Sequence, residues 1–572
     1  MKNQLVADIL YKIADLLDLK GEIFFKSRAY RQAAQTIEVL DEDIEIVVKE
    51  DRLRDIPGVG EALAKKIKEI VETNRLEFFE KLKKEIPEGL LLMLEISGLG
   101  PKKVAALYKN LGIKTIKQLR QACLDNKLRD LDGFGAITEQ NILRGISLME
   151  KTSGRVLLNV AYDDGINYIN YLKQCKKIDR LSIAGSLRRR KETIGDLDIL
   201  ASSDYPGEVM DFFVKYPDVQ RVLMQGITKT SVVLNDEIQV DLRVVKDDSF
   251  GAALQYFTGS KEHNVKMRSI AIKNGFKLNE YGLFNKDTEK YIVGKTEEEI
   301  YNKLGLAYIE PELRENRGEI EKAFEKKLPK LVEYNELKGD LHIHSNWSDG
   351  FESIETLASL AQRIGYAYIG ISDHSQSLKI AQGLSEERIK KKINEIEKIN
   401  QKLSNFRIFC GTECDIKPDG TLDYSNKILE KLDYVFAAIH TNFKMGRNEA
   451  TNRIIKGIEN EYTTALAHPT CRIIRRREPF NLDIDRIFDT AKDTDTYLEI
   501  NSFPDRLDLN DFHSKQAKEK GAKFVIGTDS HNVNQLSFIQ YGIATARRGW
   551  LEKKDILNTQ KLKDIIRIFE KH

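Results

Sequence analysis

Three aspartates in the middle of the chain have the residue type and the spacing of cation ligands. Asp196 and Asp198 are one residue apart in the strand-like run DLDIL, and the two-residue period of a strand puts both carboxylates on one face. Asp241 lies in a later strand-like run, IQVDLRVV, and could stand beside them. Three carboxylates on neighbouring strands can hold two Mg²⁺ or Mn²⁺ ions, which activate an attacking 3′-hydroxyl and stabilise a pyrophosphate leaving group. The pattern predicts a nucleotidyl-transfer site.

A phosphate-binding turn is expected shortly before this pair. Gly185 and Ser186 close one strand pattern and open a helix, so that backbone N–H groups and a hydroxyl can face phosphate oxygens. The following run, Arg188, Arg189 and Arg190, adds cations.

The last part of the chain carries a second, independent set of candidate ligands. Eight of the nine histidines fall after residue 340. Apolar strand patterns in this region each end in imidazoles or carboxylates, and the candidate metal ligands are His342, His344, Asp349, His374, Glu413, His440, His468, Asp529 and His531. This mixture suits two or three Mn²⁺, Zn²⁺ or Fe²⁺ ions better than Mg²⁺, and such ions activate water for attack on phosphorus.

The elements that must position these ligands alternate between strands and helices. Seven strand-to-loop steps run from GDLHIH to FVIGTDSH with helical patterns between them, and TYLEIN, with Glu499 and Asn501 at its end, is the sixth. Polar groups at the C-terminal ends of strands mark the active face of a βα barrel. We therefore expect a distorted (β/α)7 barrel.

The first 150 residues show helical patterns interrupted by short glycine turns. Three of the turns resemble one another: IPGVGEALAKKI at 56–67, ISGLGPKKVAAL at 96–107 and LDGFGAITEQNI at 131–142. Such turns let backbone N–H groups and a helix N-terminus approach a DNA phosphate, which binds DNA without reading its sequence. These are interpreted as helix-hairpin-helix motifs, and their DNA-binding glycines are Gly58, Gly60, Gly98, Gly100, Gly133 and Gly135.

Composition sets the remaining bounds. At 572 residues the chain should divide into three to five domains, and 41% hydrophobic with 31% charged residues is typical of a globular protein. The N-terminus has no apolar core of the kind a signal peptide needs, and no run is long enough to span a membrane. Five cysteines without a CxxC pair favour a reducing cytoplasm. The net charge of +2 excludes nothing, because a DNA-binding protein needs local basic patches.

The sequence resembles the X-family DNA polymerases, the family of DNA polymerase beta, over about residues 1–315. The likeness rests on the GS turn, the DxD pair, the later aspartate and YFTGSKEHNVKMRSIAIKNGF at 256–276. It implies that Tyr256 and Phe257 crowd the sugar and that Asn264 and Arg268 face the base pair and the template. It also implies that the triphosphate is bound by Arg155, Ser186, Arg189 and Gly195.

The N-terminal segment resembles the small lyase domain of the same family. The alignment on IPGVG puts Lys66 at the position of the lysine that forms a Schiff base with a 5′-deoxyribose phosphate. Lys26 and Tyr30 match two supporting positions and share a helix face. A second lysine of the family's pocket falls on Ala62, which weakens the positive field expected to depress the pKa of Lys66.

Residues 337–572 resemble the PHP (polymerase and histidinol phosphatase) domain, with all nine ligand positions intact. That resemblance implies that Arg472 and the run Arg475–Arg477 bind substrate phosphates. Cys471 departs from the glycine expected after HPT, which puts the close approach of that turn to a substrate in question.

The domain order is similar to that of the bacterial X-family DNA polymerases. It implies a gap-filling, template-directed polymerase of base excision repair with a 3′-5′ exonuclease that cleans 3′ ends and cuts at abasic sites. We expect gapped or nicked duplex DNA and dNTPs as partners, no membrane, a monomer, and a bacterial cytoplasmic location at the nucleoid.

The predicted architecture is multidomain, α+β and α/β. A lyase-like domain with a helix-hairpin-helix (1–84) and a helical subdomain with two such motifs (85–152) precede a nucleotidyltransferase palm (153–247) and a nucleotide-selection subdomain (248–315). A linker (316–336) leads to the PHP barrel (337–572), and the charged stretch ELRENRGEIEKAFEKKL is expected to be a helix with a solvated face.

Two other hypotheses remain open. One is a PHP small-molecule phosphatase with a DNA-binding but non-polymerising N-terminal half. The other is a non-catalytic scaffold for DNA ends. Intact Asp196, Asp198 and Asp241 argue against both, because neither role needs them.

Overall fold

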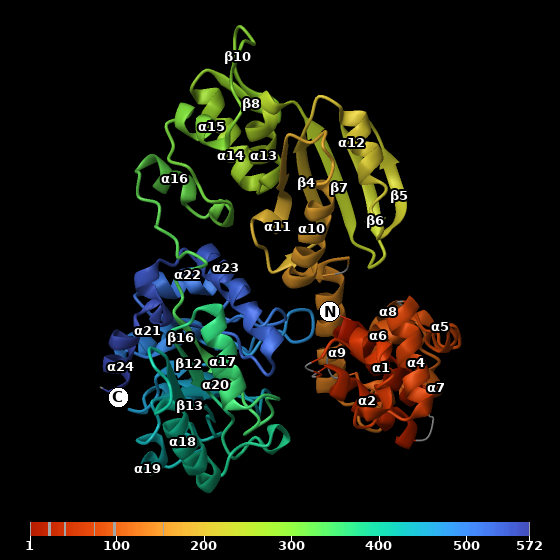
Figure 1. Ribbon diagram of the computed structural model, residues 1–572, viewed down its shortest axis with the longest axis vertical. Coiled ribbons are helices and arrows are strands. Elements are labelled where there is room, and N and C mark those ends of the chain that lie inside the picture. The colour runs from red at the N-terminus through yellow and green to blue at the C-terminus, as the bar shows by residue number, and fades with distance from the viewer. Residues whose placement is uncertain are drawn as a thin grey trace. The chain divides into compact units, whose positions relative to one another are not determined.

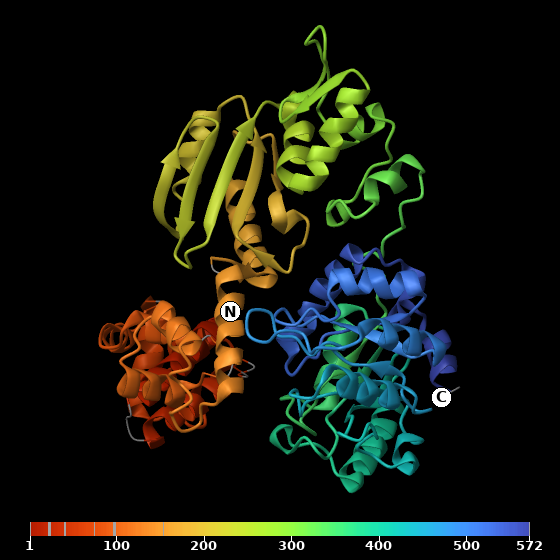
Figure 2. The ribbon, with the colours of Figure 1, turned by 180° about the vertical axis from the view of Figure 1, so that it is seen from behind.

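A computed structural model describes residues 2–20, 24–38, 40, 42–73, 75–94, 96, 99–152 and 154–570. The chain forms two compact units (Figures 1 and 2), one of Met1–Ser153 with Ile473–Glu478 and the other of Gly154–Arg472 with Pro479–His572. No helix in the described ranges is long and apolar enough to cross a membrane. The five cysteines are buried free thiols.

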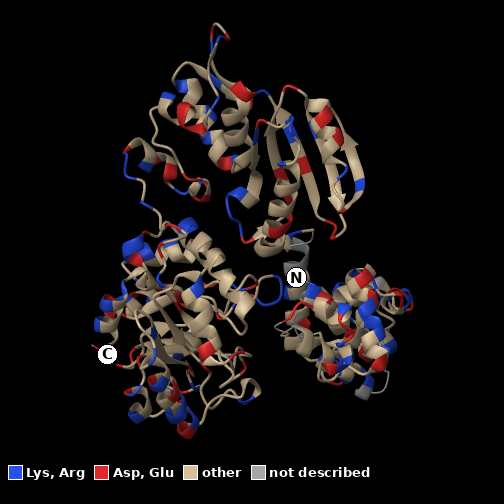
Figure 3. Ribbon diagram, viewed as in Figure 1, with Lys and Arg blue, Asp and Glu red and all other residues tan. Residues whose placement is uncertain are grey.

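The first unit is helical, as its 3.6-residue apolar patterns predict. Helix α1 lies in its core, where Leu10, Ile13 and Ala14 are fully buried. Figure 3 shows basic residues interspersed with acidic ones on these helices. The helices are α1 (Lys2–Leu19), α2 (Phe24–Glu38), α3 (Ile44–Lys49), α4 (Glu61–Thr73), α5 (Glu77–Lys84), α6 (Glu88–Leu94), α7 (Pro101–Leu111), α8 (Ile116–Leu124) and α9 (Ala136–Thr152).

The second unit begins with a five-stranded sheet in the order β2-β4-β7-β6-β5, which we call the palm sheet. Strands β4 and β7 are parallel, and the other neighbouring pairs are antiparallel. Both views show α10 and α12 on the same face of this sheet. Its elements are β1 (Val156–Leu157), α10 (Leu158–Leu172), β2 (Arg180–Ile183), α11 (Gly185–Arg188), β3 (Thr193–Ile194), β4 (Asp196–Ser202), α12 (Pro206–Phe213), β5 (Val219–Gln225), β6 (Lys229–Leu234) and β7 (Gln239–Val245).

A smaller subdomain follows the palm sheet. Two helices pack on a three-stranded antiparallel sheet, β10-β9-β8, around a core that includes Met267, Leu283 and Ile300. Its elements are α13 (Phe250–Thr258), α14 (Lys261–Lys273), β8 (Phe276–Asn279), β9 (Gly282–Asn285), β10 (Tyr291–Val293), α15 (Glu297–Lys303) and α16 (Glu319–Phe324).

The charged stretch 312–328 differs from the expectation of a solvated helix. Only Glu319–Phe324 of it is α-helical. Glu312, Arg314 and Glu319 are buried, and each has an oppositely charged or histidine partner, so their charges are compensated inside the protein. The expectation was wrong for these three residues, because a charge run shows its partners only after distant segments pack against it, whereas the charged residues from Glu321 to Lys327 are exposed as expected.

The C-terminal domain is a seven-stranded parallel barrel in the sequential order β11 to β17. A parallel bridge between Ile343 and Ser530 brings its first and last strands together, so the predicted (β/α)7 fold is confirmed. Tyr434, Phe436 and Phe569 pack together in one hydrophobic cluster of this domain. The strands are β11 (Gly339–Ile343), β12 (Tyr368–Ile371), β13 (Arg407–Asp415), β14 (Tyr434–Ala438), β15 (Ala465–Leu466), β16 (Tyr497–Asn501) and β17 (Phe524–Gly527).

Helices connect and cover these strands, as a parallel barrel requires. They are α17 (Ile354–Ile364), α18 (Glu386–Asn400), α19 (Asn426–Leu429), α20 (Arg447–Ile458), α21 (Ile484–Asp493), α22 (Asp511–Lys520), α23 (Ile539–Arg548) and α24 (Leu562–Phe569).

Candidate active sites

The three palm aspartates lie on two adjacent parallel strands. Asp198 of β4 is the direct register partner of Asp241 of β7, and Asp196 stands two residues before Asp198 on the same face of β4. The strand patterns DLDILAS and QVDLRVV are apolar on the opposite face, where Leu197 and Val240 are buried. The sheet register therefore brings together the carboxylates that the sequence could only place on separate strands.

Burial and the repulsion between carboxylates raise the pKa of two members of this triad. Burial, followed by the charges of Asp196 and Asp241, raises the pKa of Asp198 to about 7. Burial and Asp241 likewise raise the pKa of Asp196. Although burial opposes it, hydrogen bonds from Lys229, Gln239 and Ser231 lower the pKa of Asp241.

Lys229 contacts Asp241, a contact that was not predicted from the sequence. Its ammonium lies 2.7 Å from one oxygen of Asp241, and Gln239 donates to the other oxygen at 2.8 Å. Hard cations bind carboxylates of this kind, so the donor set fits divalent ions that would neutralise Asp196, Asp198 and Asp241. The sequence offered no signal for Lys229, because it stands on the neighbouring strand β6.

The first residue of α11 must be a glycine because it lies so close to this triad. Gly185 has a φ of +62°, and a Cβ at this position would lie 2.2 Å from an oxygen of Asp198. Ser186 follows it in α11 and is half-buried. The predicted phosphate turn therefore lies directly against the carboxylates.

The three arginines after this turn are largely engaged within the protein. Arg188 makes two hydrogen bonds to Glu297, at 2.6 and 2.9 Å. Arg189 pairs with Glu315 at 3.0 Å and donates to the carbonyl of Thr258. Arg188 therefore joins the palm to the following subdomain, and its contact with phosphates stays a prediction.

Two further predicted nucleotide contacts lie near Asp196. Arg155 donates to the side chain and the carbonyl of Thr193, and one of its guanidinium nitrogens would be 3.1 Å from a Cβ at Gly195. The charge of Arg155 opposes the rise in the pKa of Asp196.

The predicted nucleotide-selecting residues lie on α13 and α14. The rings of Tyr256 and Phe257 meet edge to face at 5.1 Å, and the Arg243 guanidinium lies 4.3 Å from the centre of the Phe257 ring. The Asn264 amide donates to the carbonyl of Tyr256 and accepts from Gln255 at 2.8 Å. Arg268 lies one helical turn further along α14 and is half-buried.

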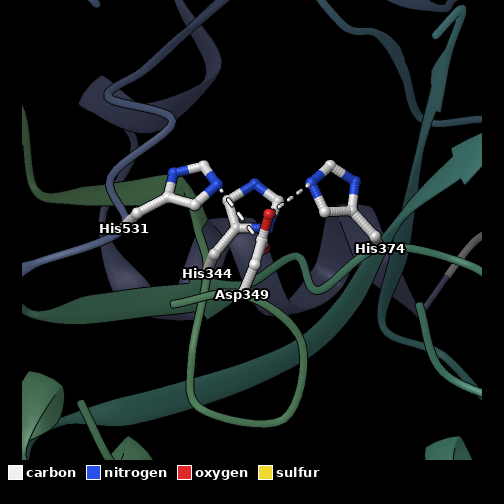
Figure 4. A group of neighbouring side chains, drawn as sticks. All are labelled: His344, Asp349, His374 and His531. Carbon is white, nitrogen blue, oxygen red and sulfur yellow. Dashed lines mark ion pairs between the residues drawn. The ribbon is translucent and has the colours of Figure 1, made fainter. Parts of the chain in front are cut away.

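The nine predicted ligands of the barrel domain gather at the C-terminal ends of its strands. Eight of them form three overlapping groups, and within each group the ligand atoms lie within 4.8 Å of one another. Figure 4 shows the first group, in which His344 and His374 face the carboxylate of Asp349 with His531 beside them. The second is His342, His344, Glu413 and Asp529, and the third is His374, Glu413 and His440. His468 adjoins them, 2.7 Å from Glu413.

Several donor atoms of this cluster fit bound metal ions. Buried ring nitrogens of four histidines and buried oxygens of Asp349 and Glu413 have no hydrogen-bond partner. Leaving such groups unsatisfied is costly, and ions would satisfy them. The histidines with such an atom are His342, His344, His374 and His468.

Charges within the cluster strongly shift its protonation. Burial opposes the change, but Glu413 and Asp415 raise the pKa of His440 to about 10. Burial together with His531 and His374 lowers the pKa of His344 to about 4. Against the effect of burial, the charge of Glu413 is stabilised by His440 and His374, which hold its pKa well below the usual value.

A second layer of carboxylates orients the imidazoles, and no sequence pattern predicted a role for these residues. Glu499 lies 2.6 Å from Nδ1 of His342 and also accepts from the backbone N–H of His468. Asp415 lies 2.9 Å from Nδ1 of His440. Such partners fix the ring orientation and raise the basicity of the ligand. The one available signal was the placement of Glu499 at the end of a strand pattern.

The turn after His468 carries Cys471 and Arg472, both of which are buried. Arg472 is buried and donates to Glu192 and to the carbonyl of Leu507, both at 2.7 Å, and its binding of a substrate phosphate stays a prediction. Cys471 has a φ of +52°, the left-handed conformation that favours the glycine expected there. The turn therefore keeps its backbone shape with a buried cysteine.

The described helix-hairpin-helix glycines stand at turns that lead into helices. Gly58 and Gly133 have φ values of +85° and +78°, and Gly60, Gly100 and Gly135 immediately precede α4, α7 and α9. A Cβ at Gly60, Gly100, Gly133 or Gly135 would meet nothing within 4 Å, so these turns have open space beside them. Gly98 lies outside the described residues.

Lys66 lies in a small aromatic site on the first unit. Its ammonium donates to the Tyr30 hydroxyl and stands 3.9 Å from the centre of the Phe78 ring. Burial, followed by the charge of Lys26, lowers the pKa of Lys66. The structure thus brings Lys66, Lys26 and Tyr30 together, and Lys26 supplies part of the field that Ala62 does not.

Family models match four parts of the chain. They are a helix-hairpin-helix domain at residues 1–76, a SAM-like helix-hairpin-helix tandem at 90–147, a DNA polymerase beta thumb at 253–315 and a PHP domain at 340–503. Together they define a polymerase-beta-like protein that carries a PHP domain.

Relatives extend this result over the full length. The DNA polymerase/3′-5′ exonuclease PolX of Bacillus subtilis is 39% identical over 567 residues, which are 99% of this chain and 99% of that protein. DNA polymerase lambda of Arabidopsis thaliana is 24% identical over 54% of this chain and 62% of its own. A probable phosphatase of Thermoanaerobacter is 26% identical over 40% of this chain and 94% of its own. The chain belongs to the PolX family, and the resemblance to bacterial X-family polymerases is confirmed.

Proposed function

We propose that the chain is a template-directed DNA polymerase that fills gaps in base excision repair and that its PHP domain hydrolyses DNA from the 3′ end. The observation that carries the proposal is the register of β4 and β7, which sets Asp198 beside Asp241 in the same chain as the nine-residue barrel cluster. A small-molecule phosphatase would need only the second of these sites.

At the palm, Asp196, Asp198 and Asp241 would hold Mg²⁺ or Mn²⁺, which supply charge neutralisation and Lewis acidity when bound. The triphosphate would be bound by Ser186, Arg189, Gly195 and Arg155. The last two of these residues lie close to Asp196. Tyr256 and Phe257 at the end of α13 would exclude a ribose hydroxyl, while Asn264 and Arg268 would face the base pair. The protein's own contribution is to orient the dNTP and the primer end.

In the barrel, the nine residues would hold two or three Mn²⁺, Zn²⁺ or Fe²⁺ ions, which supply Lewis acidity for phosphodiester hydrolysis when bound. Glu499 and Asp415 keep the rings of His342 and His440 in place. This site would trim 3′ ends, remove blocked 3′ termini and cut at abasic sites. A damaged 3′ end blocks extension, so the two sites serve one repair process.

The chain would bind gapped or nicked duplex DNA and dNTPs as a monomer. The helix-hairpin-helix turns would contact the DNA backbone through Gly58, Gly60, Gly98, Gly100, Gly133 and Gly135. Such a substrate would place the protein at the bacterial nucleoid. We also propose that Lys66 forms a Schiff base with a 5′-deoxyribose phosphate, supported by its lowered pKa and its contact with Tyr30.

A primer-extension and trimming assay tests the two sites against each other. Purified protein is given gapped, 3′-phosphate and abasic-site duplexes with Mg²⁺ or Mn²⁺. We expect Asp196→Ala with Asp198→Ala to reduce extension about a thousandfold or more and to leave Mn²⁺-dependent trimming intact. We expect His344→Ala to abolish Mn²⁺-dependent trimming and to leave extension intact. Full extension by the double variant would refute the palm assignment, and equal loss of both activities in either variant would refute separate sites.

A further inference from the structure

The loop between α11 and β3, residues 189–192, is held by the barrel domain. The carbonyl of Arg189 accepts a hydrogen bond from Arg548 of α23 at 2.6 Å. At the other end of the loop, the carboxylate of Glu192 accepts from Arg472 at 2.7 Å. Both barrel arginines are buried, so these contacts lie inside the second unit.

Arg548 also contacts two carboxylates in addition to the loop backbone. Its guanidinium also reaches Glu315 at 3.0 Å and Asp511 at 2.6 Å. Glu315 in turn pairs with the guanidinium of Arg189 at 3.0 Å. One buried arginine therefore sets the backbone of Arg189 directly and its side chain through Glu315. The planar guanidinium serves all three acceptors at once, which an ammonium cannot do in the same geometry.

The loop is fixed at its middle as well, and it is joined to the phosphate turn. Arg190 has a φ of +55°, and its guanidinium lies 4.3 Å from the centre of the Tyr162 ring. The backbone N–H of Lys191 donates to the carbonyl of Ser186 at 3.1 Å. A shift of the loop would therefore move Ser186 and Arg189 together.

We propose that Arg548 and Arg472 are positioning residues for nucleotide binding, so that the barrel domain forms part of the polymerase's dNTP site without touching the nucleotide. This inference rests on the proposed function of the palm. Ordinarily, a barrel with its own metal cluster would have no bearing on dNTP affinity. Here its arginines hold both ends of the loop that carries a triphosphate-binding residue.

The test is the steady-state kinetics of single-nucleotide insertion on gapped DNA by the full chain. Arg548→Gln should raise the KM for dNTP about tenfold while kcat changes less than about threefold, because the substitution disturbs dNTP binding more than the chemical step. Mn²⁺-dependent 3′ trimming should be unchanged, since Arg548 contacts none of the nine cluster residues through its described hydrogen bonds. Arg548→Lys should give a smaller rise in KM.

Arg547 provides a matched control on the same helix. It is as buried as Arg548 and makes a comparable ion pair, with Glu312 at 2.7 Å, and its hydrogen bonds go to Glu312 and to the carbonyl of Val332. Arg547→Gln should therefore lower the melting temperature comparably and leave the KM for dNTP unchanged. An equal rise in KM for the two variants would overturn the inference, as would an unchanged KM in Arg548→Gln.

If Arg548→Gln does not fold, Glu192→Gln decides the question. Glu192 is partly exposed, so the substitution is mild, and it weakens the second anchor of the loop. A KM rise of about threefold would support the inference, and an unchanged KM would overturn it. Wild-type protein that fails to extend primers would instead refute the proposed function.

Discussion

A lysine attacks an aldehyde only in its neutral form, so the surroundings of Lys66 decide whether its amine can react. Burial and the charge of Lys26 lower the pKa of Lys66, and Tyr30 accepts its hydrogen bond. Its neighbour Lys65 is exposed and pairs with Glu61 instead. Two adjacent lysines on one helix thus have different chemistry, because only one of them points into the aromatic site.

We predict that Lys66→Ala abolishes the covalent adduct trapped by borohydride on DNA with a 5′-deoxyribose phosphate, whereas Lys65→Ala retains it. Lys26→Ala should shift the pH profile of adduct formation to higher pH, because loss of its charge lets the pKa of Lys66 rise. Gel analysis of the trapped adduct across pH measures both effects. Wild-type trapping by the Lys66 variant would exclude this lysine as the nucleophile.

At the scale of elements, charged side chains join neighbouring segments of the second unit. Glu297 at the start of α15 pairs with Arg188 of α11 and with Arg314, which is fully buried. Despite burial, Arg314 and Arg188 lower the pKa of Glu297 to about 2. The carboxylate is therefore part of the packing between the palm and the subdomain that follows it.

We predict that Glu297→Gln destabilises the second unit by about 3–5 kcal/mol at neutral pH, because it leaves buried arginine charge uncompensated. The folded pKa lies below the ordinary value of 4.5, so this stability is present above pH 4.5 and is lost as the pH falls towards about 2. Denaturant unfolding at pH 7 and at acidic pH should show the difference between wild type and variant shrinking with acid. Glu298 is the exposed neighbour, so Glu298→Gln should lower the free energy of unfolding only slightly. Equal losses of stability in the two variants would argue against the buried network.

The positions of the strands and helices were well predicted, but the burial of some charged side chains was not. Alternating apolar residues gave β4 and β7, and the seven strand patterns of the barrel were each found. The stretch 312–328 was expected to be a solvated helix, yet Arg314 and Glu319 are buried there. Periodicity is a local property and is visible in the sequence, whereas the partner of a charge can lie anywhere along the chain.

At the scale of the whole molecule, the helical first unit and the two-site second unit are separate compact bodies. The described glycine turns that lead into α4, α7 and α9 belong to the first unit, and the palm and barrel clusters belong to the second. DNA affinity and chemistry should therefore be separable by deletion.

We predict that deletion of residues 1–152 weakens binding to gapped duplex DNA about tenfold or more and makes it less dependent on salt, because phosphate contacts are lost. Trimming of a short single-stranded oligonucleotide should persist, which controls for folding of the remaining chain. Fluorescence anisotropy at several salt concentrations measures the affinity. An unchanged affinity with an unchanged salt slope would show that the helical unit does not bind DNA.

Local patterns along the chain were enough to predict the residue types that can do chemistry, the strands and helices that carry them, and the order of the domains. Asp196 with Asp198, and the nine imidazoles and carboxylates at strand ends, were identifiable because spacing within one element is a local property. Long-range contacts in the folded protein were needed to show that Asp198 faces Asp241 and that Glu499 orients His342. The same holds for the pairing of Arg188 with Glu297 and of Arg472 with Glu192. Those contacts join residues far apart in the chain, and packing alone selects such partners.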